Sequence, residues 1–307
     1  MAVTTAPAGK VKKAKAYQQE EKKLPLGKQI IYQILCLLIT FTVLFPIFWV
    51  VSISISPLSD ARPKDLIPKN ASFDAYRRVW EQPTSNPISF PELAFNSFKL
   101  AAGTSLFAVF IGVSAAYAFS RFKFRGRGAL MLAVLGVLML PNVATLAPLF
   151  TLLNRVQLGD FNLRNSLWGV GLAVVSGALP FAIWNLKGYL DTIPIDLEEA
   201  ASIDGATRNQ VFLRIVLPLA VPALAVTAFL GFLGGWTEFF YSWQFLTNPK
   251  DFTLAMALSG MSGQYARTTP WAQFSAFAIL VALPVAVVYL FLQKYIVGGL
   301  TVGGSKG

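Results

Sequence analysis

Two short stretches of this apolar chain carry the residue types that could do chemistry or bind a partner. The first is EEAASIDGATRNQVFLRIVLPLA, residues 198–220, and the second is WTEFFYSW, residues 236–243. Carboxylates beside small residues can present a docking surface to another molecule. A carboxylate among aromatic rings can accept hydrogen bonds from a hydroxylated solute. The elements that hold these two stretches therefore decide what the chain can do.

The first stretch predicts a short helix that ends abruptly. Asp196 can cap this helix, and Glu199, its third residue, can reach back to it in a variant of the capping box. Gly205 can end the helix because glycine takes the left-handed conformation without steric cost. We expect Ala200 and Ala201 to let another molecule approach this helix closely, because their side chains are small.

A second short helix is predicted two residues after the glycine. Thr207 and Gln210 form a capping box, T-x-x-Q, and the helix continues through Val211, Phe212 and Ile215. Pro218 then leads into the next apolar run. A helix end and a helix start within three residues predict a tight bend that protrudes from the membrane surface.

The second stretch centres on Glu238, which lies toward the outer end of an apolar run. A carboxylate inside a membrane is costly and usually faces protein or a water-filled cavity. Trp236, Glu238 and Tyr241 are therefore candidates for a substrate path, with sugar faces stacking on the rings. The alternative is an ordinary interfacial glutamate within the aromatic belt of a membrane helix.

Composition places the whole chain in a bilayer. Of its 307 residues, 55% are hydrophobic and 13% charged, with a mean hydropathy of +0.56, whereas soluble domains are about 25% charged. A membrane helix needs about 20 apolar residues, and the sequence predicts an all-α, polytopic membrane protein with about six transmembrane helices. The predicted spans are residues 30–54, 94–119, 129–153, 166–186, 219–243 and 272–297.

Basic residues gather at the predicted membrane edges rather than on one face, so the net charge of +11 indicates contact with membrane lipid and not with nucleic acid. Lysines precede the first span, and Arg121, Lys123, Arg125 and Arg127 fill the loop after the second. The positive-inside rule places both segments, and with six spans both termini, in the cytoplasm.

Several kinds of site are missing from the sequence. There is no histidine, Cys36 is the single cysteine, and the spans hold almost no acids, bases or nucleophiles, so we expect no catalytic residue and no metal site. The tail has Gly299 and Gly304 at phosphate-loop spacing, but Ser305 and Lys306 stand in reversed order and no helix follows. A nucleotide site, if one is used, must belong to another chain. Gly231 and Gly235 form a G-x-x-x-G that suits packing within this chain or against a partner.

The bend resembles the EAA loop of permease subunits of binding-protein-dependent ABC importers. The resemblance is carried by Glu199, Ala200, Ala201, Asp204, Gly205, Ile215, Leu217 and Pro218. It implies a coupling helix that docks in a cleft of an ATPase subunit, where Glu199 would face a basic residue.

Over nearly the whole chain the sequence is similar to maltose-type permeases of the MalG kind, notably at residues 114–126, 186–207 and 293–307. Related sugar permeases commonly have W-N-E-F in span five, where this chain has Thr237 in place of the asparagine. The resemblance further implies that the tail, including Gly303 and Gly304, contacts the ATPase subunits. The alternative is a frayed terminus. It also implies that the loop 248–270 faces a binding protein.

The resemblance implies a type I ABC importer permease in a bacterial or archaeal cytoplasmic membrane. Its parts are a basic tail (1–29), a first helix with an external loop (30–92), a permease core (93–298) with the coupling loop at 191–218, and a C-terminal tail (299–307). Its expected partners are a second homologous permease, two ATP-binding subunits that hold the ATP and Mg, and an extracytoplasmic sugar-binding protein. Maltose or maltooligosaccharide is the expected cargo; the alternatives are another oligosaccharide, a sugar alcohol or glycerol phosphate. The alternative functions are those of an ATP-independent channel or carrier and of a membrane enzyme.

Overall fold

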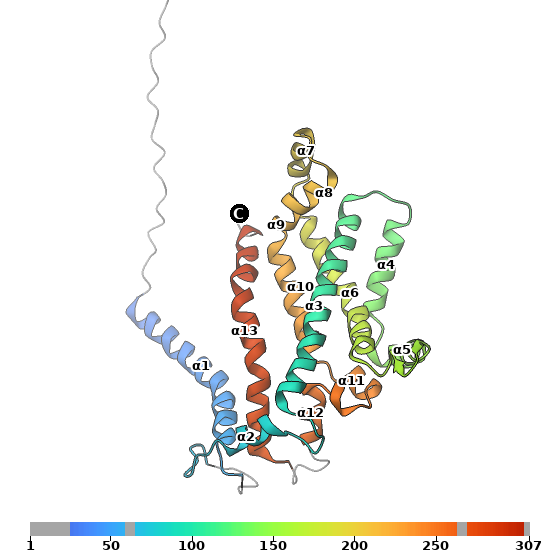
Figure 1. Ribbon diagram of the computed structural model, residues 1–307. Helices are drawn as coiled ribbons and strands as arrows, with labels where there is room; N and C mark the ends of the chain where they lie inside the picture. The colour runs from blue at the N-terminus through green and yellow to red at the C-terminus, as the bar shows by residue number, and fades with distance from the viewer. Residues whose placement is uncertain (1–24, 59–64, 263–268, 304–307) are drawn as a thin grey trace, which may run out of the picture. The chain divides into compact units, whose positions relative to one another are not determined.

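The computed structural model describes residues 25–58, 65–262 and 269–303, and helices make up most of them (Figure 1). In chain order the longer helices are α1 (Leu26–Ser54), α3 (Phe90–Arg121), α4 (Arg127–Leu138), α5 (Asn142–Asn154), α6 (Leu167–Leu190), α10 (Val221–Trp236) and α13 (Trp271–Gly303). The shorter ones are α2 (Asp74–Glu81), α7 (Asp196–Ile203), α8 (Arg208–Val211), the π-helix η1 (Phe212–Val216), α9 (Leu217–Leu219), α11 (Phe240–Phe245), the 3-10 helix η2 (Pro249–Asp251) and α12 (Leu254–Met261). A small antiparallel ribbon, β1 (Gln157–Leu158) with β2 (Phe161–Asn162), follows α5.

Five helical stretches among the described residues are long and apolar enough to cross a membrane. They are α1, α3, α6, residues Val221–Phe245 and residues Trp271–Tyr295. A bent pair, α4 with α5, makes a sixth if it counts as one span. The prediction of an all-α polytopic protein with about six spans is therefore confirmed.

The third predicted span, residues 129–153, is not one straight helix. Helix α4 ends at Leu138, α5 begins at Asn142, and the two are bent by 104°. Pro141 lies at this break in an extended conformation, with φ −67° and ψ 136°. Proline cannot donate a backbone hydrogen bond, and it disfavours helical geometry in the residue before it. The apolar run therefore divides at the proline.

The chain divides into two compact units, Met1–Phe48 and Trp49–Gly307. In the first unit the described residues form most of α1, and its apolar side chains are exposed, such as Leu37 and Phe41. Such a helix suits a lipid environment better than water. The second unit holds the remaining helices and all three clusters of buried apolar side chains.

In the second unit α3 packs lengthwise against both α6 and α10. Two glycines of α10 permit the close approach, because a Cβ atom on Gly231 would stand 2.9 Å from the Ser105 Cα atom and one on Gly235 would stand 2.6 Å from the Ala101 Cα atom. The G-x-x-x-G of span five thus packs against α3 of the same chain, which resolves the two alternatives left open by the sequence.

The short helices α7 and α8 lie at one end of this bundle, and α2 and α12 lie at the other (Figure 1). Beneath α7 and α8 is a cluster of buried apolar residues drawn from α3, α6, η1 and α10. Its members include Val113, Leu186, Leu190 and Val216. The bend packs on this cluster through Ala201 and Ala206.

Candidate functional site

The bend between α7 and α8 is built as two local motifs. After α7, the Gly205 N–H donates to the Ser202 carbonyl (3.1 Å) and the Ala206 N–H to the Ala201 carbonyl (3.0 Å). Gly205 has φ +86°. These two bonds and the left-handed glycine are a Schellman motif. The predicted role of Gly205 in ending the first helix is confirmed.

The second motif opens α8. The Thr207 N–H donates to the Gln210 Oε1 atom (2.8 Å), and the Gln210 N–H donates to the Thr207 Oγ1 atom (3.4 Å). This is the capping box predicted from T-x-x-Q. The helix end at Gly205 and the helix start at Thr207, two residues later, together define the bend between α7 and α8.

The predicted cap of the first helix is wrong. Helix α7 begins at Asp196 itself; its N-cap residue is Ile195, in a helical conformation and without a side-chain cap. The N–H groups of Glu198 and Glu199 both donate to the Ile195 carbonyl (2.9 and 3.1 Å). The helix thus starts one residue earlier than expected, because the Ile195 carbonyl accepts the N–H groups that the Asp196 side chain was expected to bind. The acidic residues instead lie in the first turn, where they complement the helix dipole.

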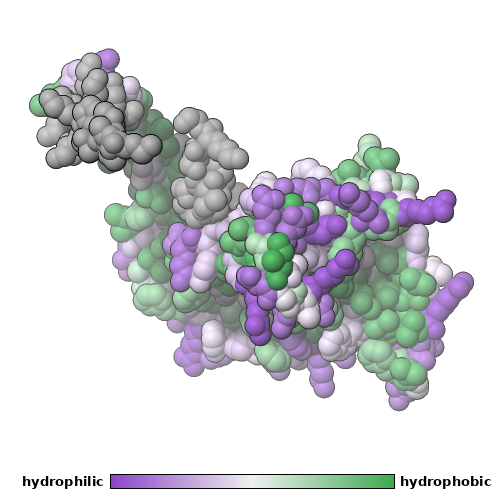
Figure 2. Space-filling view, turned by 90° about the horizontal axis from the view of Figure 1, so that it is seen from above, coloured by the Kyte–Doolittle hydropathy of each residue, from purple (hydrophilic) through white to green (hydrophobic). Residues whose placement is uncertain are grey.

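The outward side of α7 combines charge with exposed apolar surface. Glu199, Ala200, Asp204 and Gly205 are exposed, and Ile203 is 87% exposed. Figure 2 looks onto this end of the molecule and shows hydrophilic side chains with hydrophobic atoms exposed among them. Glu199 and Ile203 are thus both accessible to another molecule on the outward side of α7.

The opposite side of α7 is held to the body of the protein. Ala201 is half-buried against the apolar cluster beneath it. Glu198 is the buried residue of α7, and its Oε1 atom lies 2.6 Å from the Arg121 Nε atom of α3. Its Oε2 atom accepts a hydrogen bond from the Tyr117 hydroxyl (3.1 Å). The side chains of Glu198 and Arg121 are each only 10% exposed.

Arg121 also reaches the end of α6. Its Nη2 atom donates to the carbonyls of Leu190 and Ile193, each at 3.0 Å, and its Nη1 atom donates to the Ser120 hydroxyl (2.8 Å). One guanidinium therefore contacts α3, the last turn of α6 and α7. The planar fork of arginine suits such a role, because its donors point in several fixed directions.

A second acidic residue extends this network. The Asp191 carboxylate accepts hydrogen bonds from the Ser120 hydroxyl and from the Lys187 ammonium, both at 2.6 Å. Burial acts to raise the pKa of the Asp191 carboxyl, but the hydrogen bonds from Lys187 and Ser120 outweigh it and hold the pKa below its ordinary value. The carboxylate form is favoured, and the ends of α3 and α6 are joined at a second point.

The segment after the bend is helical but irregular. Ile215 and Leu217 are half-buried and Pro218 is exposed. Residues Phe212–Val216, expected as ordinary helix, form the π-helix η1. Such π-turns often occur at functional sites. In the tail, α13 continues through Gly303, and Gly304 lies outside the described residues.

The three candidates for a substrate path are buried within this chain. The Trp236 Nε1 atom donates to the Val281 carbonyl (3.1 Å), and the Tyr241 hydroxyl bonds the Thr145 hydroxyl (2.9 Å). Glu238 accepts hydrogen bonds from the backbone N–H groups of Tyr241 (2.7 Å) and Ser242 (3.0 Å) and from the Ser242 hydroxyl. Glu238 therefore caps α11, where span five breaks after Trp236.

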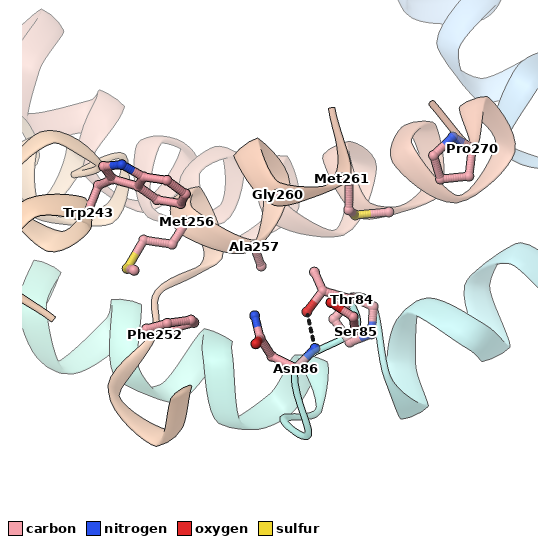
Figure 3. Close-up of a pocket in the computed structure, with 11 residues that line it drawn as sticks. Thr84, Ser85, Asn86, Trp243, Phe252, Met256, Ala257, Gly260, Met261 and Pro270 are labelled. Atoms are coloured by element: carbon pink, nitrogen blue, oxygen red, sulfur yellow. Dashed lines mark hydrogen bonds between the residues drawn. The ribbon is translucent and has the colours of Figure 1, made fainter. Parts of the chain in front are cut away.

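A pocket of about 420 Å³ lies at the end of the bundle opposite α7 (Figure 3). Met256, Ala257 and Met261 line it from α12, and the residues 83–86 face them. Trp243, which is 54% exposed, stands at one end. This pocket includes part of the loop 248–270 that was expected to face a binding protein; residues 263–268 of that loop lie outside the described residues.

The pairing of Arg121 with Glu198 is not predictable from the sequence. In the sequence Arg121 belongs to a basic loop that indicates topology, and Glu198 is one of two adjacent glutamates. Tyr117 and Arg121, four residues apart at the basic end of span two, could have suggested a site for a carboxylate. Their spacing does not indicate which carboxylate they bind. Within the described residues no group of three or more potential acidic, histidine or cysteine ligands gathers to hold a metal ion.

Among the described residues, the fold is that of a helical protein with five to six stretches long and apolar enough to cross a membrane and a bend between two of them. Residues 108–302 match the family described as "Binding-protein-dependent transport system inner membrane component". The chain belongs to this family and is an inner-membrane component of a transport system.

Individual relatives agree with this assignment. The chain is 35% identical over 298 residues to the maltose/maltodextrin transport system permease protein MalG of Escherichia coli, covering 94% of this chain and 99% of the relative. It is 34% identical over 265 residues to the galactooligosaccharides transport system permease protein GanQ of Bacillus subtilis, covering 86% and 91%. The trehalose transport system permease protein SugB of Mycobacterium tuberculosis is 33% identical over 265 residues, covering 86% and 93%.

The fold is also shared with solved structures. A chain of a bacterial ABC transporter involved in the import of the acidic polysaccharide alginate matches with a TM-score of 0.68 at 23% identity, covering 87% of this chain and 95% of that chain. At this identity the likeness concerns the fold alone.

Proposed function

We propose that this chain is one of two permease subunits of an ATP-driven sugar importer, with maltose or maltooligosaccharide as its cargo. The observation that carries the proposal is the bend at the end of the bundle, where α7 presents Glu199 and Ile203 to the outside. In this proposal α7 is the coupling helix, and it docks in a cleft of an ATP-binding subunit that holds the ATP and Mg. A second, homologous permease completes the path, and a binding protein delivers the sugar.

Several features support this assignment over an ATP-independent carrier. Two adjacent helix-end motifs give the bend a defined geometry, and α7 exposes Glu199 together with Ile203, which is 87% exposed. Both features suit a surface that must keep one shape while it binds and releases a partner. We further propose that Gly303 and Gly304 contact the ATPase subunits.

The proposed orientation places this end of the bundle in the cytoplasm, together with both termini of the chain. Basic residues near membrane ends support it. The pocket beside Trp243 would then open toward the binding protein. The expected cargo follows from the MalG-type relatives. Galactooligosaccharide and trehalose are the second candidates, because the chain is almost as similar to permeases named for them.

Copurification and uptake test the proposal. The tagged chain should copurify from membranes with a second permease and a nucleotide-hydrolysing subunit, and a deletion strain should lose uptake of labelled maltotriose. Uptake of labelled galactobiose and trehalose in the same strain separates the cargoes. A chain that copurifies with no ATPase, in a strain whose sugar uptake is unchanged, would contradict the proposal.

A further inference from the structure

Helix α7 is attached to the rest of the chain by a very small set of contacts. Its eight residues include one that is buried, Glu198. Leu197 and Ile203 are 46% and 87% exposed. Ala201 is half-buried on the apolar cluster, and the carboxylate of Glu198 is the buried polar group that anchors this helix.

Arg121, which pairs with the Glu198 carboxylate, also bonds the end of α6. Arg121 is the last residue of α3 and pairs with Glu198 at 2.6 Å, and it donates to the carbonyls of Leu190 and Ile193 at the end of α6. Tyr117, one turn earlier in α3, bonds the other oxygen of Glu198. We call these contacts the α3–α7 link. They connect α7 directly to the two helices that pack side by side in the body.

The chain itself joins α7 to the membrane helices on both sides. Residues 191–195 lead from the end of α6 into α7, and α8, the π-helix η1 and α9 lead from α7 to α10. A π-turn is a local irregularity in the helical hydrogen bonding. The covalent chain therefore connects α7 to α6 and α10, whereas the α3–α7 link adds α3 and ties its last residue to the carbonyls of Leu190 and Ile193.

We propose that Arg121, Glu198 and Tyr117 are positioning residues that make α7 move as one body with the ends of α3 and α6. The inference rests on the proposed coupling function, since it concerns how the movement of a docked α7 reaches the spans. The docking surface itself is separate, because Glu199 and Ile203 face outward while Glu198 faces α3. Loss of the link therefore leaves docking intact and weakens the transmission of movement.

A buried ion pair can also serve stability alone, and the double variant separates the two roles. Removing one partner leaves an uncompensated buried charge, which is strongly destabilising, whereas removing both avoids that penalty. Arg121→Gln and Glu198→Gln should each lower the membrane abundance of the chain, and the double variant should recover it. If the pair positions α7, the double variant should still transmit movement poorly.

The experiment uses the complete complex of both permeases and the ATPase subunits, in proteoliposomes with its binding protein and labelled maltotriose. The readout is maltotriose imported per ATP hydrolysed, with copurifying ATPase measured alongside. Each single variant and the double variant should lower this ratio roughly fivefold or more, the low end of typical coupling between sites. Copurification of the ATPase should remain normal in all three variants.

Two further variants provide a milder change and a control. Tyr117→Phe removes one hydroxyl and leaves the ring packed against Phe212; it should lower the ratio in the same direction by a smaller factor, even if the charge variants fail to accumulate. Glu81→Gln is the matched control, because Glu81 pairs with Arg77 on the exposed side of α2, at the other end of the bundle. It should leave the ratio unchanged.

The outcomes separate this inference from the proposed function. A wild-type ratio in the double variant and in Tyr117→Phe would overturn the positioning role and leave the importer assignment standing. Loss of ATPase copurification in Glu198→Gln at normal abundance would also overturn it, because the pair would then belong to docking. Failure of the unaltered chain to bind any ATPase would overturn the proposed function and, with it, the link.

Discussion

Gly235 of α10 lies so close to Ala101 of α3 that a Cβ atom on the glycine would stand 2.6 Å from the Ala101 Cα atom. The contact is between backbones, so no flexible side chain can move aside. Gly235 therefore sets the distance between the two helices at the centre of the second unit.

Gly235→Ala should destabilise the protein by about 2 kcal/mol, because overpacking forces α10 away from α3. The measurement is the thermal unfolding midpoint of the detergent-solubilised chain, with maltotriose uptake alongside. Gly234→Ala is the control, since a Cβ atom there would meet nothing within 4 Å. Equal midpoints for the two variants would show that the helices can separate without penalty.

The bend should depend on the left-handed conformation of Gly205, where φ is +86°. Gly205→Val should cost about 1–2 kcal/mol locally, because a β-branched side chain fits this region poorly. Membrane insertion should be normal, while ATPase copurification and uptake fall. Gly205→Asn should be far milder, since asparagine tolerates the conformation. Wild-type behaviour of the valine variant would mean that the bend is only a connector.

Glu199 should matter for docking and not for folding, because its side chain is exposed on the outer side of α7. Glu199→Lys should place a like charge opposite the basic residue expected on the ATPase, and copurification of the ATPase should fall several-fold. Glu81→Lys, a charge reversal at the opposite end of the bundle, is the control. The docking assignment is contradicted if both reversals behave alike after normalisation to membrane abundance.

Glu238 should act first as the cap of α11. Glu238→Ala leaves the N–H groups of Tyr241 and Ser242 without their acceptor, and a buried unsatisfied group costs about 1–3 kcal/mol. The unfolding midpoint should drop, whereas Thr237→Ala at the adjacent exposed position should leave it nearly unchanged. Lost uptake at an unchanged midpoint would instead support direct contact with the sugar.

The proposed orientation can be tested by labelling, after Cys36, the single cysteine, is replaced by serine. Arg125→Cys should react with a membrane-impermeant maleimide only after permeabilisation, because the basic loop after α3 is expected in the cytoplasm. Asn70→Cys, in the exposed segment before α2, should react in intact cells. The reverse pattern would invert the topology and place α7 outside.

Local signals in the sequence predicted the existence of the spans and the bend, but not the break of the third span at Pro141 or that of span five after Trp236. Apolar runs near 20 residues long predict membrane helices because the bilayer sets their length. Gly205 and the pair Thr207–Gln210 act on neighbours within a few residues, so their effect is visible without a fold. The cap predicted at Asp196 failed because the Ile195 carbonyl accepts the N–H groups of Glu198 and Glu199 instead.

The tertiary structure alone decided which distant residues meet. Arg121 and Glu198 are 77 residues apart, and nothing in either segment distinguishes Glu198 from Glu199 as the buried partner. The direction of each side chain follows from how α7 rests on the cluster beneath it. Likewise, Gly231 and Gly235 permit close packing against any helix, and only the packed bundle selects α3. The physical reason is that burial and ion pairing depend on surfaces from several elements, whereas capping and hydrophobic length depend on one.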